Sequence, residues 1–185
     1  MEDGRSVESL TVGREGAVGL LAAFGDSKSV SRAIIQIAGA ALKIRVDHLR
    51  EVAAREPSIN NVVVRYAQAV EAQLHQAAAC NALHHIEARL CRWLLTCQDR
   101  TGDSVLPLTH EFLALMLGAQ RTSVTLAAQA VKRRGLIAYR RGVITMLDRV
   151  GVENASCECY QATEDVYDRI FARAGANSSG RTLDA

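Results

Sequence analysis

The feature that most limits how this chain can fold is a pair of short helical segments separated by one glycine. Thr109 can cap the first segment, and Gly118 can adopt the positive φ of a tight turn after it. The second segment runs from about Gln120 to Arg134. Two helices that cross closely need a small residue at the crossing, and Ala114 provides one. Their shared core would contain Leu113, Leu117, Ala119, Val124 and Ala127. This pattern predicts a helix-turn-helix.

The second segment lies in the most basic part of the chain. The net charge is +2, but residues 119–149 contain seven basic residues and one acid, so they carry +6 and the remainder carries −4. No acid lies between Glu111 and Asp148, whereas a solvated helix face usually carries Glu–Lys pairs. The seven basic residues are Arg121, Lys132, Arg133, Arg134, Arg140, Arg141 and Arg149. This concentration of charge beside a helix-turn-helix indicates DNA as the partner.

Specific side chains of this segment are suited to reading DNA. Arg121, Thr125 and Gln129 recur at steps of four residues, with Thr122 beside them; arginine pairs with guanine, and threonine can contact thymine. Beyond Gly135, two short apolar segments flank an Arg-Arg-Gly turn, which predicts a wing whose arginines contact phosphates. The expected DNA contacts are Thr109, Gln120, Arg121, Thr122, Ser123, Thr125, Gln129, Lys132, Arg140 and Arg141.

Apolar residues recur at helical spacing after Pro57. Their steps are 4, 3, 4, 4 and 3 residues, which predicts a helix of about 23 residues from Ser58 to Cys80. The stripe consists of Ile59, Val63, Tyr66, Val70, Leu74 and Ala77. We expect a second copy of the chain to cover this stripe, because little core precedes it. The alternative is that the stripe packs against its own domain.

The chain before Glu56 has the pattern of a small β-rich unit. Three segments are expected to be strands: 7–12, 33–37 and 41–46. Asp47 would cap a short helix that ends at Arg55. Asp3–Gly4 is a hairpin-turn signal, but no strand precedes it in the sequence. We therefore expect a fragment, a product of a misplaced start codon or a natural short form.

The chain beyond the long helix is expected to be mostly helical outside the wing. A break near Asn81 should be followed by a helix over 85–97, whose inner face holds Ile86, Leu90, Trp93 and Leu94. A polar loop over 99–104 comes next. A last helix is expected near 164–173, before a disordered end at 177–185.

The five cysteines do not form a disulfide framework, and we expect reduced thiols in a cytoplasmic protein. No apolar run reaches the roughly 18 residues of a membrane span, and the N-terminus is polar. Cys80 and His84 lie four residues apart, with His85 and Cys91 nearby, and Cys157 is close to Cys159. Neither group has the spacing of a four-ligand site, so buried thiols are preferred to a metal or redox site. Nothing arranges a catalytic pair, and no glycine-rich phosphate loop is present, so an enzyme is not expected.

Residues 12–160 resemble the Crp/Fnr family of bacterial transcription regulators. The resemblance is strongest in the helix-turn-helix (Leu-Thr-His-Glu-Phe-Leu-Ala-Leu-Met-Leu-Gly-Ala-Gln-Arg-Thr-Ser-Val-Thr), in the Lys-Arg-Arg-Gly-Leu-Ile that follows, and in the wing. It implies that Arg121 is the DNA-reading arginine and that Thr109 contacts phosphate. The family often has Glu where Thr122 stands, so the target half-site is not carried over. Similar members dimerise through the long helix.

The resemblance also suggests what the N-terminal unit is. Family members begin with an eight-stranded β-roll that binds an effector, and Gly13-Arg14-Glu15-Gly16 resembles a signature of its phosphate-binding cassette. Residues 29–32 and Leu74–His75 do not match the cyclic-nucleotide contacts of the family, so no cyclic nucleotide is expected. The N-terminal cysteine cluster of the iron–sulfur branch is absent from the sequence. No cofactor or metal is therefore expected.

The expected fold class is α+β and mainly α. It comprises a partial β-roll remnant (1–56), a dimerisation helix and hinge (57–81), a winged helix-turn-helix domain (82–160) and a C-terminal helix and tail (161–185). The expected function is that of a homodimeric transcription regulator on near-palindromic double-stranded DNA, with RNA polymerase as a candidate further partner. The alternative is a truncated partner that modulates a full-length relative without binding DNA itself.

Overall fold

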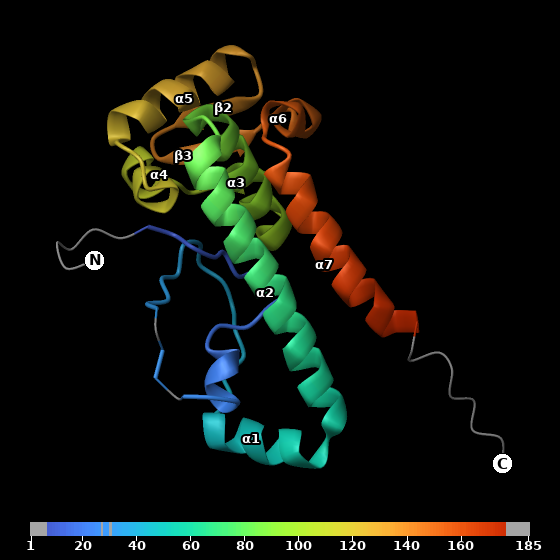
Figure 1. Cartoon of the computed structure of the whole chain (residues 1–185). Helices are drawn as coiled ribbons and strands as arrows, with labels where there is room; N and C mark the ends of the chain where they lie inside the picture. Colours follow the sequence, from blue (N-terminus) through green and yellow to red (C-terminus); the bar gives the residue numbers. More distant parts are fainter. Residues whose placement is uncertain (1–6, 27, 30, 177–185) are drawn as a thin grey trace.

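The computed structural model describes residues 7–26, 28–29 and 31–176 of the chain, and within them helices predominate. Figure 1 shows a compact group of elements at one end, from which two long helices extend. The elements are η1 (Leu20–Ala23), α1 (Val46–Arg55), α2 (Pro57–Leu83), α3 (Ile86–Thr101), β1 (Val105–Leu106), α4 (His110–Leu117), α5 (Arg121–Arg133), β2 (Ile137–Arg140), β3 (Val143–Met146), α6 (Arg149–Ala155) and α7 (Cys159–Ala176).

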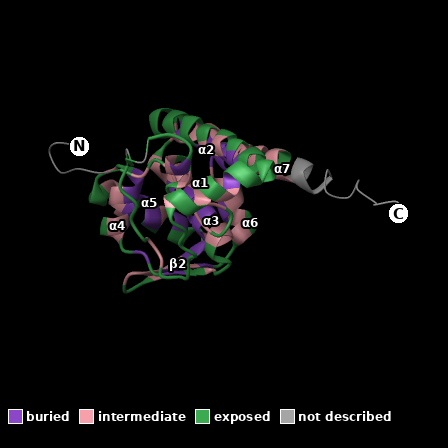
Figure 2. Ribbon diagram, turned by 90° about the horizontal axis from the view of Figure 1, so that it is seen from below, coloured by how far each residue is buried: buried purple, intermediate pink, exposed green. Residues whose placement is uncertain are grey.

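The winged helix-turn-helix forms the main hydrophobic core. Trp93, Leu90 and Leu94 of α3 lie at its centre, fully or almost fully buried. Figure 2 shows this concentration of buried residues where α3 lies inside the domain. The sheet has the order β1-β3-β2 with antiparallel pairing, and Ile137 of β2 faces Met146 of β3. The predicted helix-turn-helix and wing are confirmed as local structure.

The long helix is confirmed, and α7 packs along it. α2 has 27 residues and ends at Leu83, so the chain breaks at residues 84–85 rather than at Asn81. Figure 1 shows α2 and α7 side by side and running in opposite directions. The Tyr167 hydroxyl of α7 donates a hydrogen bond to the Gln73 side-chain oxygen of α2 at 3.0 Å. α7 therefore covers part of α2 within a single chain.

The three strands expected before Glu56 are wrong. The described residues of 7–45 contain the short helix η1 and no strand. A strand needs a neighbouring strand to satisfy its backbone groups, and none lies beside these segments in the described structure; Ile35 and Leu42 remain exposed. The expected short helix is present as α1, but its N-cap is Arg45 rather than Asp47. The Asp3–Gly4 turn lies outside the described residues.

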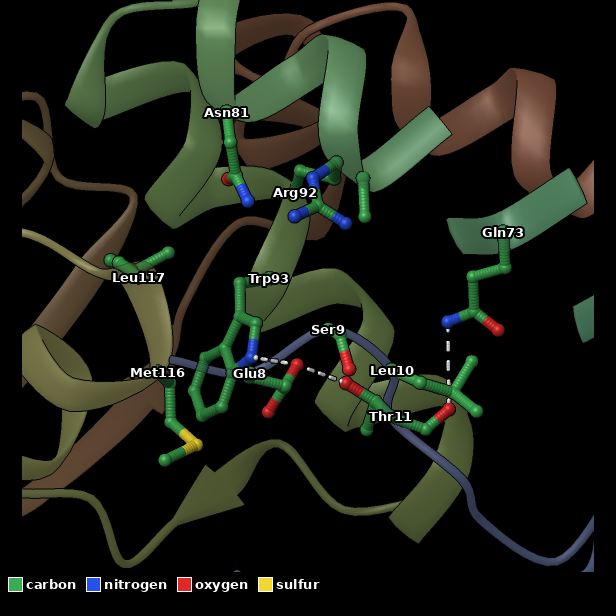
Figure 3. A pocket seen from close by; sticks show the side chains of 11 residues that line it. Glu8, Ser9, Leu10, Thr11, Gln73, Asn81, Arg92, Trp93, Met116 and Leu117 are labelled. Carbon is green, nitrogen blue, oxygen red and sulfur yellow. Dashed lines mark hydrogen bonds between the residues drawn. The ribbon is translucent and has the colours of Figure 1, made fainter. Parts of the chain in front are cut away.

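The segment that begins at Val7 instead packs on α2 and α3. The Glu8 carboxylate accepts a hydrogen bond from the Trp93 ring nitrogen at 2.9 Å, and Figure 3 shows these two side chains pointing toward each other. Gln73 donates to the Thr11 carbonyl oxygen at 3.5 Å. The pocket between them has a volume of about 20 Å³, roughly enough for one water molecule. It is a packing seam and has no room for an effector.

Several C-terminal boundaries differ from expectation. α3 continues to Thr101, past the expected end at Cys97. β1 and α6 were not expected, because they are too short to show a period of their own. The last helix begins at Cys159 rather than near Glu164. The end at 177–185 lies outside the described residues. Among the described helices, none combines the length and the apolar character that crossing a bilayer requires.

Candidate DNA-binding surface

The turn between α4 and α5 is built as the sequence predicts. Thr109 caps α4 by accepting a hydrogen bond from the Phe112 backbone nitrogen at 3.2 Å. Gly118 ends α4 with a φ of 58°, a conformation that favours glycine. The inner face of α5 is buried against α3 and α4. Its buried residues are Val124, Ala127, Ala128 and Val131. This packing directs the opposite face of α5 away from the domain.

The outer face of α5 is polar and basic around one apolar side chain. Its exposed residues include Arg121, Thr122, Gln129, Lys132 and Arg133. Leu126 lies among them with 66% of its surface exposed. Figure 1 shows that α5 lies on the outside of the domain, far from α1. Sequence reasoning missed Leu126, although its position four residues after Thr122 places it on the same face.

Arg121 points outward, in contact with Glu111 of α4. Their side chains form an ion pair at 2.7 Å, with 66% and 67% of their surfaces exposed. Such exposed pairs contribute at most about 1 kcal/mol. Arg121 can therefore exchange this partner for another acceptor at little cost. The carboxylate of Glu111 also interrupts what the sequence presented as an acid-free surface.

His110 links both helices to the wing, which the sequence did not predict. Its Nδ1 atom lies 3.1 Å from the Thr125 hydroxyl, and its ring stacks on Tyr139 with centroids 4.2 Å apart. Thr125 is therefore half-buried and already hydrogen-bonded, whereas the sequence predicted an exposed side chain that reads bases. Burial, and then the charge of Arg121, lower the pKa of His110. The neutral imidazole is thus the form that this packing favours.

The lowered pKa of His110 predicts that acid weakens the domain. Unfolded chains take up the proton at the ordinary histidine pKa of about 6.5, whereas the folded chain does so only at lower pH. Stability should therefore fall as the pH drops below about 6.5. We expect thermal unfolding to show this loss in the wild type and a smaller loss in His110→Gln. Equal pH dependence in the two proteins would show that His110 is not responsible.

The wing brings two arginines beside the helix-turn-helix. Arg141 and Gly142 form the two-residue turn between β2 and β3, with φ values of 49° and 79°. A Cβ atom on Gly142 would lie 3.3 Å from the Thr109 side chain, so the turn is next to the start of α4. Arg140 and Arg141 are exposed. In the described part of the chain, no ion pair holds either of them.

Besides Arg121, two of the seven basic residues form ion pairs with acidic side chains. Arg149 forms ion pairs with Asp99 at 2.8 Å and with Glu153 at 2.9 Å. Arg134 pairs with Glu87 at 3.0 Å. The exposed cationic surface is therefore narrower than the sequence suggested.

The predicted dimerisation stripe on α2 is divided between two faces. Val63 and Tyr66 are buried within the chain, and the Tyr66 hydroxyl donates to the Ala17 carbonyl oxygen at 3.1 Å. For these two residues the alternative, packing within the chain, is confirmed. Leu74 is 37% exposed and Val64, outside the predicted stripe, is 58% exposed. The half-buried members are Ile59, Val70 and Ala77.

Comparison with known proteins identifies this domain. Residues 88–155 match the family model of the Crp-like helix-turn-helix domain. A comparison with curated protein sequences gives no match.

Several solved structures are similar to part of this chain. FixK2 from Bradyrhizobium japonicum superposes with a TM-score of 0.55 at 12% identity, over 62% of this chain and 60% of that one. A CooA variant from Carboxydothermus hydrogenoformans gives 0.50 at 17% identity, over 59% and 54%. A Crp/Fnr-family protein from Eubacterium rectale gives 0.48 at 20% identity, over 63% and 52%. The chain thus spans 52% to 60% of these three proteins. Residues 88–155 of this chain therefore form a Crp-like helix-turn-helix domain.

Proposed function

We propose that this protein regulates transcription by inserting α5 into the major groove of a specific DNA site. The observation that carries the proposal is the outer face of α5, which lies beside the exposed wing arginines. A major groove admits an α-helix, and phosphates bind the cations beside it. The family match over residues 88–155 supports the same role.

The proposed contacts divide into side chains that read DNA bases and side chains that bind the DNA phosphate backbone. Arg121 can donate two hydrogen bonds to guanine, Leu126 can pack on a thymine methyl group, and Gln129 can pair with adenine. Thr122 completes this set. The phosphate-binding set contains Thr109, Gln120, Lys132, Arg133, Arg140 and Arg141. Gln120 suits that role because its side chain makes no capping bond to α5.

His110 and Ser123 have a different part in this proposal. His110 contacts the Thr125 hydroxyl and so holds Thr125 at the edge of the base-reading face of α5. There Thr125 helps to position α5. Ser123 is half-buried, so it contacts DNA only at the margin of the binding surface. Base recognition therefore depends mainly on Arg121, Leu126 and Gln129.

We further propose that two copies bind together through α2. At about 100° per residue, one face of the helix contains Val64, Ala67, Leu74 and Ala78, with the exposed Glu71 among them. Their spacings of 3, 7 and 4 residues are those of a helix pair, and Val64 and Leu74 are exposed in the single chain. Two recognition helices would then read half-sites about 34 Å apart on near-palindromic DNA.

Selection of bound DNA from a random pool, at fixed salt, tests the function directly. We expect an enriched site with two related halves whose centres are about 10 base pairs apart. Recovery of the unchanged pool, with affinity that depends only on salt, would contradict the proposal.

The wing arginines should contribute affinity without sequence preference. We expect Arg140→Ala and Arg141→Ala to weaken all DNA sequences alike, and each to reduce the slope of log affinity against log salt by about 1. Arg55→Ala, at the far end of the molecule in α1, removes the same charge and is the control. A loss confined to the selected site would assign the wing to base reading instead.

A further inference from the structure

Three cysteines and a histidine converge where α2 ends and α7 begins. Cys80 lies in the last turn of α2, and His84 follows that helix. Cys157 lies between α6 and α7, and Cys159 is the first residue of α7. Each of the four side chains offers one ligand atom, and all these atoms lie within 4.8 Å of one another.

The distances match the edges of a tetrahedron around one metal ion. Zinc lies about 2.3 Å from sulfur and about 2.0–2.1 Å from nitrogen, so sulfur ligands of one ion lie about 3.8 Å apart. The sulfur atoms of Cys80 and Cys157 are 3.5 Å apart, and the Cys159 sulfur is 3.4 Å from His84 Nδ1. Slight outward movement would admit a single ion. Iron–sulfur clusters need ligands on separate iron atoms, and this group is too tight for them.

The surroundings of His84 are those of a metal ligand. Its Nε2 atom lies 3.2 Å from the carboxylate of Glu158. Metal-bound histidines usually donate their second ring nitrogen to such a carboxylate, which fixes the ring and leaves the other nitrogen for the ion. Here the other nitrogen, Nδ1, faces the cysteine sulfur atoms. The Glu158 side chain is otherwise largely exposed to solvent.

Burial and charge also suit an anionic metal site. Cys80, Cys157 and Cys159 are buried, and they form a small core of their own. Three thiolates, a neutral imidazole and Zn²⁺ sum to a charge of −1, and cations lie nearby. The Nε atoms of Arg89 and Arg92 are buried without a partner among the described residues.

The cluster also reaches the surface, because 24% of the His84 side chain is exposed. A surface pocket of about 210 Å³ is lined by Ser156, Cys157 and Glu158. Burial therefore does not prevent an ion from entering.

We propose that Cys80, His84, Cys157 and Cys159 bind one Zn²⁺ ion. The ion would tie the end of α2 to the start of α7, next to the break that separates α2 from α3 (Figure 1). This junction is coupled to the helix-turn-helix, because Arg89 donates hydrogen bonds to Asn81 and to the Leu117 carbonyl oxygen. Metal binding therefore stiffens the connection through which α2 positions α5.

Metal content and cobalt spectra of the purified full chain test the site. We expect one equivalent of zinc per chain, and expect Co²⁺ to replace it with the visible bands of tetrahedral thiolate coordination. Cys80→Ser and Cys157→Ser should lose the bound metal and these bands. Cys91→Ala is the control, because Cys91 is buried in α3 outside the cluster and burial raises its pKa to about 12.

The exposed Glu158 allows a test that does not depend on folding of a cysteine variant. We expect Glu158→Gln to weaken zinc binding roughly 10- to 100-fold in competition with a chelator. Asp165→Asn, which also neutralises an exposed acid on α7, should leave it unchanged. The proposal would be overturned if reduced wild-type protein bound no zinc, if Cys157→Ser bound it as well as wild type, or if Cys80 and Cys157 formed only a disulfide.

Discussion

Arg121→Ala is expected to weaken binding to the selected DNA site by about 1–3 kcal/mol and to relax the preference at one base pair. Arg121 extends from the first turn of α5, and the exposed Glu111 is its partner in the free protein. Because that exposed ion pair contributes little, breaking it costs only a small part of the free energy that Arg121 gains by hydrogen bonding to guanine. Its loss should therefore remove recognition of one base while α5 stays folded.

Fluorescence anisotropy with the selected site, and with single-base variants of it, measures this change. Glu111→Gln is the informative companion, because it frees Arg121 and should leave binding equal or tighter. Arg133→Ala removes the same charge from the same face of α5 and should weaken all sites equally. If Arg121→Ala bound the selected site as tightly as wild type, another residue would have to read the base.

Leu74→Glu is expected to separate the proposed dimer and to reduce affinity for a two-half site roughly 100-fold or more. Linking two binding modules raises overall affinity by about 10²–10⁴, and a monomer loses this gain. Leu74 lies on the exposed face of α2 with Val64, so a carboxylate there would be buried without a partner in the dimer. The folded monomer should tolerate the change, because Leu74 is not part of its core.

Sedimentation measures the oligomeric state, and binding to one or two half-sites measures the effect on affinity. Val62→Glu is the matched control, since it adds the same charge to an exposed apolar position about a third of a turn or more from each residue of the proposed interface. A monomeric wild type, or a dimer that survives both Leu74→Glu and Val64→Glu, would exclude this face as the interface.

Local rules were enough to predict the winged helix-turn-helix. The Thr109 cap, the positive φ of Gly118 and the inner face of α5 all follow from the requirements of single helices and turns. The long helix was predictable for the same reason, because its apolar period extends over many turns. Such signals act within a few residues, and the sequence displays them directly.

Tertiary contacts decided which face of α2 stays exposed and whether the N-terminal segments form strands. α7 and the N-terminal segment contact Tyr66 and Gln73, so the face of α2 that stays exposed is rotated from the predicted stripe and shares Leu74 with it. The expected strands before Glu56 did not form, because a strand depends on a neighbour that local sequence cannot specify.

The sequence by itself determined the helices, the glycine turn and the basic wing of this protein, because each depends on residues adjacent along the chain. Only the tertiary structure brought Cys80 and His84 to Cys157 and Cys159, across more than 70 residues of sequence. Each pair alone has too few ligands for a metal site. Their meeting depends on the antiparallel packing of α2 and α7, which spacing within either segment does not reveal.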